Sequence, residues 1–171
     1  MSEQHTANFD VRPSVPVQDY LLAAHRINVG YELAFELATA LLRAHCPEDA
    51  HLLLIGAGGG TEVGVFGRAV PHWRLTGVDP SANMLALARA CVDTYGLADR
   101  VQLIQGTVDD LTPIPHYDAA TCFYVLMHLP DDGTKQHLLQ SIVQRLKAGA
   151  PLILVDTVRD NRAVFLSAWQ H

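Results

Sequence analysis

Short apolar runs and longer amphipathic stretches alternate along the chain. The run at 52–55 has no polar alternation, which is typical of a strand that is covered on both faces in a parallel sheet. A second strand is expected over 72–79, where the segment ends in a carboxylate, and the intervening residues 61–70 can form a helix. This order predicts the first β-α-β unit of an open α/β sheet.

Apolar residues recur at helical spacing in other regions. From Gln18 to Ala44 they predict two helices that are separated near Gly30, with apolar positions at Leu21, Leu22, Leu33, Leu37, Leu41 and Leu42. Ser81 is the expected N-cap of the next helix. A further helix, opened by Asp131 or Asp132, is expected to bury Leu138, Leu139, Ile142, Val143 and Leu146.

Glycines cluster directly after the first predicted strand. Gly56, Gly58, Gly59 and Gly60 permit a tight turn and a close backbone approach that side chains would block. Asp79, at the end of the second predicted strand, is suitably placed to accept hydrogen bonds from a pair of ribose hydroxyls. Strand, glycines, helix, strand and acid in this order indicate a binding site for an adenosine-containing cofactor.

The glycine spacing separates two classes of cofactor. A dinucleotide fingerprint has the spacing G-x-G-x-x-G, whereas Thr61 occupies the sixth position here and the spacing is G-x-G-x-G. This form resembles motif I of the class I S-adenosylmethionine (SAM)-dependent methyltransferases. The resemblance covers about residues 50–157 and continues through the blocks GVDPSANML, VQLIQGTVDDL, YDAATCFYVLMHLP and RLKAGAPLILVDT.

The resemblance implies a fold, a cofactor and a reaction. The fold would be a Rossmann-like three-layer α/β sandwich with a mostly parallel twisted sheet, in which about five strands are present and the usual sixth and seventh are missing. Residues 1–45 would form an N-terminal tail and helical cap. Residues 46–171 would form the SAM-binding domain, shortened at its C-terminus, with a last helix that begins near Asp160. The enzyme would transfer a methyl group from SAM directly to a small-molecule acceptor.

The resemblance also assigns roles to residues of this chain. The residues expected to bind the cofactor are Gly56, Ala57, Gly58, Gly60, Asp79, Pro80, Met84, Thr107, Val108 and Phe123. His128, after the fourth strand, is the candidate catalytic base, and a histidine that merely packs beside Leu129 is an equally good interpretation. The N-terminal helices, with Tyr20 and Tyr31, would cover the pocket. The histidines show no H-E-x-x-H spacing, and no metal site is predicted.

Two positions depart from the family pattern. The family usually carries an acid two residues before the first glycine of motif I, where it helps to orient the loop and the methionine end of the cofactor; this chain has Leu54. The acid at the adenine edge is replaced by Thr107, which leaves its hydroxyl, the backbone N–H of Val108 and the nearby Asp109 as candidate contacts. Both departures concern contacts to the cofactor and leave the fold unaffected.

Composition and charge narrow the choice of partners. A formal net charge of −6 with scattered arginines argues against broad nucleic-acid binding. No apolar run approaches the ~20 residues of a membrane span, and the polar N-terminus is not a secretory signal. An odd number of cysteines without paired spacing predicts reduced thiols and a cytoplasmic location. An uncovered edge after the fifth strand predicts either a homodimer or a poorly soluble chain.

Three classes of function remain open at this stage. A small-molecule methyltransferase is favoured by the order of the motifs. A non-catalytic or truncated SAM-binding protein is suggested by Leu54, Thr107 and the short C-terminus. An NAD-dependent oxidoreductase is disfavoured by Thr61, which stands where the dinucleotide fingerprint has a glycine. The methyl acceptor is not encoded in any motif of the sequence, because one fold serves many substrates.

Overall fold

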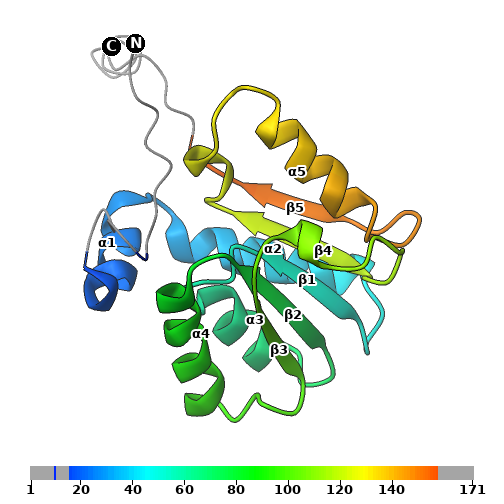
Figure 1. Ribbon diagram of the computed structural model, residues 1–171. Helices are drawn as coiled ribbons and strands as arrows, with labels where there is room; N and C mark the ends of the chain where they lie inside the picture. Colours follow the sequence, from blue (N-terminus) through cyan, green and yellow to red (C-terminus); the bar gives the residue numbers. More distant parts are fainter. Residues whose placement is uncertain (1–9, 11–15, 158–171) are drawn as a thin grey trace, which may run out of the picture.

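Five parallel strands form one sheet in the computed structural model, which describes residue 10 and residues 16–157 (Figure 1). The strands lie in the order β3-β2-β1-β4-β5. From β1 the chain first adds β2 and β3 on one side and then crosses to add β4 and β5 on the other. In open α/β sheets, ligands bind at such a reversal, in the crevice outside the carboxyl ends of the strands. The strands are β1 His51–Ile55, β2 Arg74–Asp79, β3 Val101–Gln105, β4 Ala119–Phe123 and β5 Leu152–Val155.

Helices cover both faces of this sheet. One buried apolar cluster joins alternate residues of β1 to α2, α3 and α4, and a second cluster joins the intervening residues to α5. Since both faces of β1 are buried, its unbroken apolar run is explained. The expected Rossmann-like three-layer α/β sandwich is confirmed. The helices are α1 Tyr20–Ile27, α2 Tyr31–His45, α3 Thr61–Ala69, α4 Ala82–Thr94 and α5 Thr134–Val143, with 3-10 turns η1 Val17–Asp19, η2 Val108–Asp110 and η3 Leu126–His128.

The two helices expected before the first strand are present, and they are separated at Gly30. This glycine has φ +76°, a left-handed conformation that favours glycine, and α2 begins at the next residue. However, α2 does not bury its leucine face. Leu33, Leu37 and Leu41 are each about half exposed, at 55%, 56% and 51%. The buried residues of α2 are Tyr31, Phe35, Ala38, Thr39 and Leu42.

Glycines give α3 a face on which α4 can approach closely. A Cβ atom added at Gly64 would lie 2.9 Å from Sγ of Cys91, and one added at Gly67 would lie 2.6 Å from Cδ1 of Leu97. These glycines weaken α3 as an isolated helix. Their place in the fold is therefore explained by packing of Gly64 against α4 and of Gly67 against Leu97, in the turn that follows α4.

The N-cap of α5 lies one or two residues later than the expected Asp131 or Asp132. The Oδ1 atom of Asp132 accepts hydrogen bonds from the backbone N–H of Thr134, at 3.1 Å, and from its hydroxyl, at 2.6 Å. Gly133 then occupies the N-cap position with φ +104°, so that the helix begins at Thr134. Ile142 is fully buried as expected, but the expected burial of Val143 is wrong: this last residue of α5 is 60% exposed.

The last helix expected, from near Asp160, lies outside the described residues. Among the residues that are described, β5 pairs with β4 alone, and Leu154 on it is 44% exposed. No helix within the same residues is both long and apolar enough to cross a bilayer. The three cysteines are free thiols.

Candidate functional site

The glycine loop connects the carboxyl end of β1 to α3. Gly56 has φ +72°, and its N–H donates to the carbonyl of Val78 at 2.9 Å, which ties the loop to β2. A Cβ atom at Gly56 would lie 2.5 Å from Cγ2 of Val125. Gly59 and Gly60 are also left-handed, with φ +81° and +76°. Only glycine combines this positive φ with so close an approach to Val125, so a side chain at position 56 would push the loop away from the segment that follows β4.

Asp79, the last residue of β2, links the glycine loop to the sheet by hydrogen bonds. Its Oδ2 atom accepts the N–H of Gly58 at 2.9 Å, and its Oδ1 atom accepts the N–H of Ser81 at 2.8 Å. Burial raises the pKa of this carboxyl, which is only 9% exposed, and the two N–H donors oppose that shift. A carboxylate has about four acceptor sites. Two sites therefore remain for two hydroxyl donors.

Asp10, far from α4 in sequence, accepts hydrogen bonds from the N-terminal end of α4. The expected cap is confirmed, because the Ser81 hydroxyl oxygen accepts the N–H of Met84 at 3.1 Å. The same hydroxyl donates to Oδ1 of Asp10 at 2.6 Å. The Asp10 carboxylate also accepts the N–H groups of Ala82 and Asn83, both at 3.1 Å. These bonds lower the pKa of Asp10, as the positive end of a helix favours a negative charge.

Tyr20 of α1 lies over the glycine loop. A Cβ atom at Gly59 would lie 2.9 Å from Cε1 of the Tyr20 ring. Burial raises the pKa of the Tyr20 hydroxyl, and the negative charges of Asp79 and Glu62 raise it further. The tyrosine therefore stands within the field of both carboxylates, one at the end of β2 and one at the start of α3. The role of the N-terminal helices as a cover over a bound cofactor stays a prediction.

Aromatic rings gather where β4 ends. Tyr31 stacks on Tyr124, with ring centroids 5.6 Å apart, and its hydroxyl donates to Oγ1 of Thr61 at 3.1 Å. Tyr124 has φ +58°, a conformation that is strained for a bulky side chain and that recurs at functional sites. Phe123 packs against Phe35, with centroids 4.9 Å apart, inside the core. Its backbone, rather than its ring, is what Phe123 can offer to a ligand.

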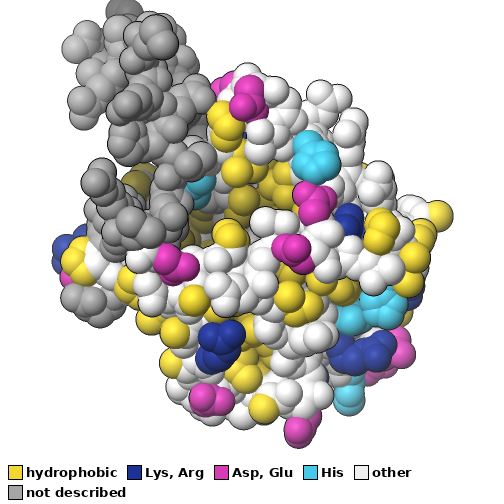
Figure 2. Space-filling model, in the orientation of Figure 1, with side chains coloured by type: hydrophobic (Ala, Val, Ile, Leu, Met, Phe, Trp, Pro, Cys, Tyr) yellow, Lys and Arg dark blue, Asp and Glu magenta, His cyan; other side chains and the backbone are white. Residues whose placement is uncertain are grey.

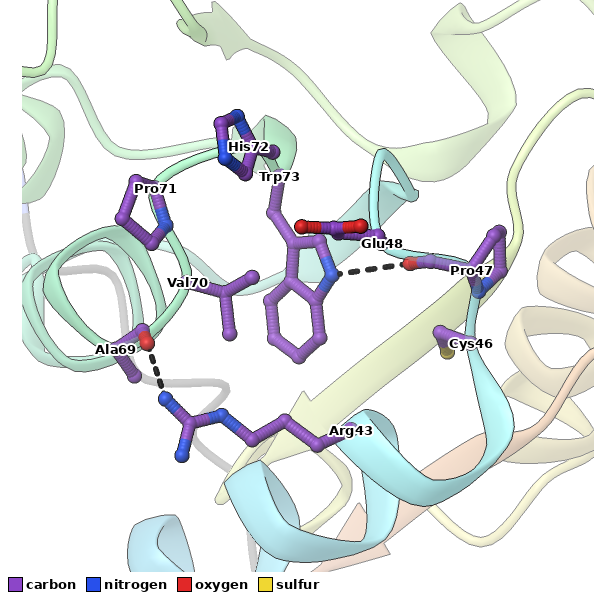
Figure 3. Close-up of a pocket in the computed structure, with 9 residues that line it drawn as sticks. All are labelled: Arg43, Cys46, Pro47, Glu48, Ala69, Val70, Pro71, His72 and Trp73. Carbon is purple, nitrogen blue, oxygen red and sulfur yellow. Dashed lines mark hydrogen bonds between the residues drawn. The ribbon is translucent and has the colours of Figure 1, made fainter.

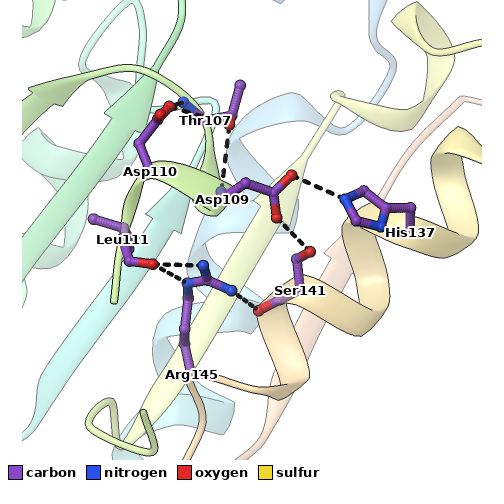
Figure 4. Close-up of polar contacts among 7 residues, drawn as sticks. All are labelled: Thr107, Asp109, Asp110, Leu111, His137, Ser141 and Arg145. Atoms are coloured by element: carbon purple, nitrogen blue, oxygen red, sulfur yellow. Dashed lines mark hydrogen bonds and ion pairs between the residues drawn. The ribbon is translucent and has the colours of Figure 1, made fainter. Parts of the chain in front are cut away.

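The turn after β3 is fixed by its own acids (Figure 4). The N–H of Thr107 donates to Oδ2 of Asp110 at 2.7 Å, and its hydroxyl donates to the same oxygen at 3.3 Å. Asp109 instead faces α5, where its carboxylate accepts the Ser141 hydroxyl at 2.5 Å and approaches Nε2 of His137 at 3.0 Å. Asp109 therefore anchors α5 to this turn and is not directed at an adenine. The capped turn leaves the Val108 N–H as the candidate contact.

The remaining predicted residues lie along the same edge of the sheet. Pro80 is exposed between β2 and α4, whereas Ala57, Met84 and Val108 are buried. The Met84 carbonyl accepts the N–H of Gly59 at 3.2 Å, which joins α4 to the glycine loop. His128 ends η3, directly after β4. All the predicted site residues thus come from segments that meet at the carboxyl ends of β1, β2, β3 and β4.

A separate depression of about 490 Å³ lies at the opposite end of the sheet (Figure 3). It is lined by the end of α2, the end of α3 and the residues that precede β1 and β2, including Arg43 and Trp73. Trp73 is 1% exposed, and its indole N–H donates to the Pro47 carbonyl at 3.3 Å. Because the amino ends of the strands border this depression, it is not the site built from the glycine loop.

Comparison with known proteins agrees with this geometry. Residues 53–152, more than half of the chain, match the family described as Methyltransferase domain. The chain belongs to this methyltransferase family. The membership predicted from the glycine spacing and the motif order is therefore confirmed.

Individual relatives of this methyltransferase domain are longer proteins. Over 132 residues the chain is 30% identical to demethylmenaquinone methyltransferase of Lactiplantibacillus plantarum, covering 76% of the chain and 54% of that relative. The YcgJ protein of Bacillus subtilis shares the fold with a TM-score of 0.65 and 26% identity, over 78% of the chain and 54% of YcgJ. A SAM-dependent methyltransferase of Geobacter sulfurreducens, solved with S-adenosylhomocysteine, has a TM-score of 0.62 at 22% identity, over 82% of the chain and 55% of that protein. The chain spans about half the length of these proteins.

Three residues at the site of the methyltransferase domain were not found from the sequence. Asp10 lies in a segment without periodicity, and nothing in the sequence links it to α4. Tyr124 stands in the block YDAATCFYVLMHLP, but its backbone strain has no signal in the sequence. Glu62 is 6% exposed although it is acidic. The only signal in the sequence is that this acid is followed by five small or apolar residues, 63–67.

Proposed function

We propose that this methyltransferase domain binds SAM at the carboxyl edge of its sheet and transfers the methyl group to a small-molecule acceptor. The observation that carries the proposal is the contact between Asp79 and the N–H of Gly58, at 2.9 Å. This contact places the acid that would bind the ribose next to the loop that would surround the rest of the cofactor. The two acceptor sites that the Asp79 carboxylate retains match the two hydroxyls of a ribose.

The glycine loop and the first turn of α4 would hold the cofactor by backbone contacts. Gly56, Ala57, Gly58 and Gly60 form the loop, and Pro80 and Met84 border the ribose and adenine side. The Val108 N–H and the turn at Thr107 would recognise the adenine edge, and the backbone at Phe123 would line the other side. The family resemblance and the convergence of these segments at one edge of the sheet support these assignments.

The bound cofactor supplies an activated methyl group on a sulfonium sulfur. The protein has to align donor and acceptor and to exclude water. Tyr20, which covers Gly59, and the stacked pair Tyr31 and Tyr124 are placed to exclude water from the edge of the sheet. We assign the role of base to His128, which would accept a proton from the acceptor near neutral pH. Its position in η3 is fixed by the neighbouring Met127 N–H, which donates to Oδ2 of Asp156 at 3.1 Å.

A small molecule is the acceptor class that the surface favours. Basic side chains are few and set apart on the face of the described residues shown in Figure 2, and the net charge of the chain is −6. The name of the Lactiplantibacillus relative points in the same direction, since demethylmenaquinone is a small molecule. A cytoplasmic location and a homodimer stay predictions.

Calorimetric titration of the purified chain tests the proposal. S-Adenosylmethionine and S-adenosylhomocysteine are expected to bind with micromolar Kd, whereas NAD is expected not to bind. Binding of NAD alone would replace the proposal by an oxidoreductase. Binding of the two sulfur nucleosides without methyl transfer to any acceptor in a screen would favour a non-catalytic SAM-binding protein.

A further inference from the structure

Glu62 is a buried carboxylate that the proposed cofactor contacts do not use. It is the second residue of α3 and is 6% exposed. Its Oε1 atom accepts a hydrogen bond from the Thr121 hydroxyl at 2.5 Å. In the described part of the chain, the four ion pairs found all involve other carboxylates. Glu62 is therefore placed in the interior with a neutral partner.

The sheet register locates this carboxylate. Thr121 of β4 is the direct neighbour of Leu54 in β1. Paired residues of adjacent parallel strands project to the same face, so the Glu62 carboxylate stands over the sheet beside Leu54. Leu54 comes two residues before Gly56, which is where motif I of the family usually has an acid. Glu62 of α3 thus places a carboxyl group beside Leu54, where the family's acid in the first strand is missing.

Among the described residues, the groups on the same side of the sheet whose pKa the charge of Glu62 raises are the hydroxyls of Tyr20 in α1 and Tyr31 in α2, and neither carries a positive charge. Cys122 of β4, whose pKa the same charge also raises, lies on the opposite face of the sheet. Burial raises the pKa of Glu62 to about 8, and the hydrogen bond from Thr121 opposes that shift. A buried carboxylate without a cation is unfavourable in its charged form. A ligand that brings a positive charge would remove that penalty.

Glu62 and Asp79 border the same region from two sides. Both charges act on the Tyr20 hydroxyl, whose ring lies over Gly59. Asp79 marks the end of β2, and Glu62 marks the β1 and β4 side, through Thr121. A nucleoside whose ribose is bound at Asp79 and which extends along the glycine loop would carry its 5′ substituent toward the β1 and β4 side, where Glu62 lies. In S-adenosylmethionine that substituent ends in an amino acid, whose α-amino group is a cation.

We propose that the Glu62 carboxylate binds the α-ammonium group of the cofactor's methionine portion, while Asp79 holds the ribose. This inference rests on the proposed function and assigns one further contact within it. Glu62 would then distinguish nucleosides that carry the amino acid from those that lack it. The Thr121 hydroxyl is a positioning group, because it fixes one oxygen of Glu62 and leaves the other for the ligand.

The test compares two ligands that differ in the amino acid. S-Adenosylhomocysteine carries the ammonium group, whereas 5′-methylthioadenosine has the same nucleoside and sulfur without it. The variant Glu62→Gln keeps the size of the side chain and an oxygen that can accept from Thr121. We expect its Kd for S-adenosylhomocysteine to rise by about tenfold or more, since a charge-assisted bond is lost, and its Kd for 5′-methylthioadenosine to stay within about twofold. Glu36→Gln, at an exposed position of α2, is the matched control and is expected to change neither Kd.

A second measurement needs no variant. With a pKa of about 8, Glu62 is largely protonated at pH 7 in the free protein. Binding of an ammonium group favours the carboxylate, so S-adenosylhomocysteine is expected to release close to one proton per molecule bound. Calorimetry in buffers of different ionisation enthalpy measures that number. The value for 5′-methylthioadenosine is expected to be near zero.

The outcomes separate this inference from the proposed function. Equal weakening of both ligands by Glu62→Gln, or equal proton release with both ligands in the unmodified protein, would overturn the role of Glu62 while the cofactor site stands. If the unmodified protein binds neither ligand nor S-adenosylmethionine, the proposed function fails and takes the inference with it.

Discussion

Replacement of Asp79 by Asn is the substitution that tests the site most directly. The two carboxylate oxygens accept two backbone N–H groups, from Gly58 at 2.9 Å and from Ser81 at 2.8 Å. Asparagine has the same shape but only one oxygen, so its NH₂ group must face one of these N–H donors. One buried N–H then loses its acceptor, which costs about 1–3 kcal/mol.

The same substitution removes the charge that would bind the ribose. Loss of charge-assisted bonds to the two hydroxyls is expected to weaken the binding of S-adenosylhomocysteine by about 2 kcal/mol, or roughly 30-fold in Kd. For a domain of this size, a loss of 1–3 kcal/mol in stability corresponds to a fall of about 2–12 °C in Tm. Tm is measured by circular dichroism without ligand, and Kd by calorimetry below the lower Tm.

Asp93→Asn, at an exposed position of α4, is the matched control and should change neither quantity. An unchanged Tm for Asp79→Asn would show that the two N–H contacts do not stabilise the fold. An unchanged Kd would show that the cofactor is bound elsewhere, and would refute the assignment of Asp79.

Three further predictions concern other parts of the structure. Gly58→Ala would place a Cβ atom 2.5 Å from Oδ2 of Asp79, so we expect calorimetry to show a Kd for S-adenosylhomocysteine at least about tenfold higher. Asp93→Ala, at an exposed position of α4, should leave this Kd unchanged. Asp109→Ala removes the bonds to α5, and urea denaturation is expected to show a loss of about 1–2 kcal/mol; unchanged stability would show that Asp109 does not anchor the helix. Burial, helped by the charge of His116, lowers the pKa of His51 from 6.5 to about 4. Because the unfolded chain then binds more protons, stability is expected to be full above pH 6.5 and to fall as the pH drops toward 4, and the slope over that window should flatten in His51→Gln when measured by urea denaturation.

Local chemistry explains why the geometry of the glycine loop and of the turn after β2 could be predicted from the sequence. The glycine loop, the acid of Asp79 and the cap at Ser81 depend on neighbours that lie close along the chain, so their residue types and spacing were sufficient. The start of α5 was placed at Asp131 or Asp132 because an acid is a good cap. In the structure, Asp132 accepts hydrogen bonds from Thr134 in a turn that precedes the helix. An aspartate is common both in such turns and at helix caps, so the residue type alone does not distinguish the two.

Tertiary contacts explain what could not be predicted. Asp109 was a candidate for the adenine edge, and only the position of α5 shows that its carboxylate is already bound by Ser141. Asp10 reaches α4 across more than seventy residues of sequence. Glu62 is buried because β4 places a hydroxyl opposite it. Each of these depends on elements that are distant in sequence, and periodicity does not carry that information.

The glycine face of α3 has a consequence for the order in which the protein folds. Each interior glycine costs a helix about 1 kcal/mol relative to alanine, and α3 contains two of them in nine residues. A helix this short and this weak has almost no stability in the unfolded chain. It is therefore expected to form only after α4 and the central strands have assembled to receive it. The segment that follows the cofactor loop is then among the last to become ordered, and the chain acquires its binding edge at the end of folding.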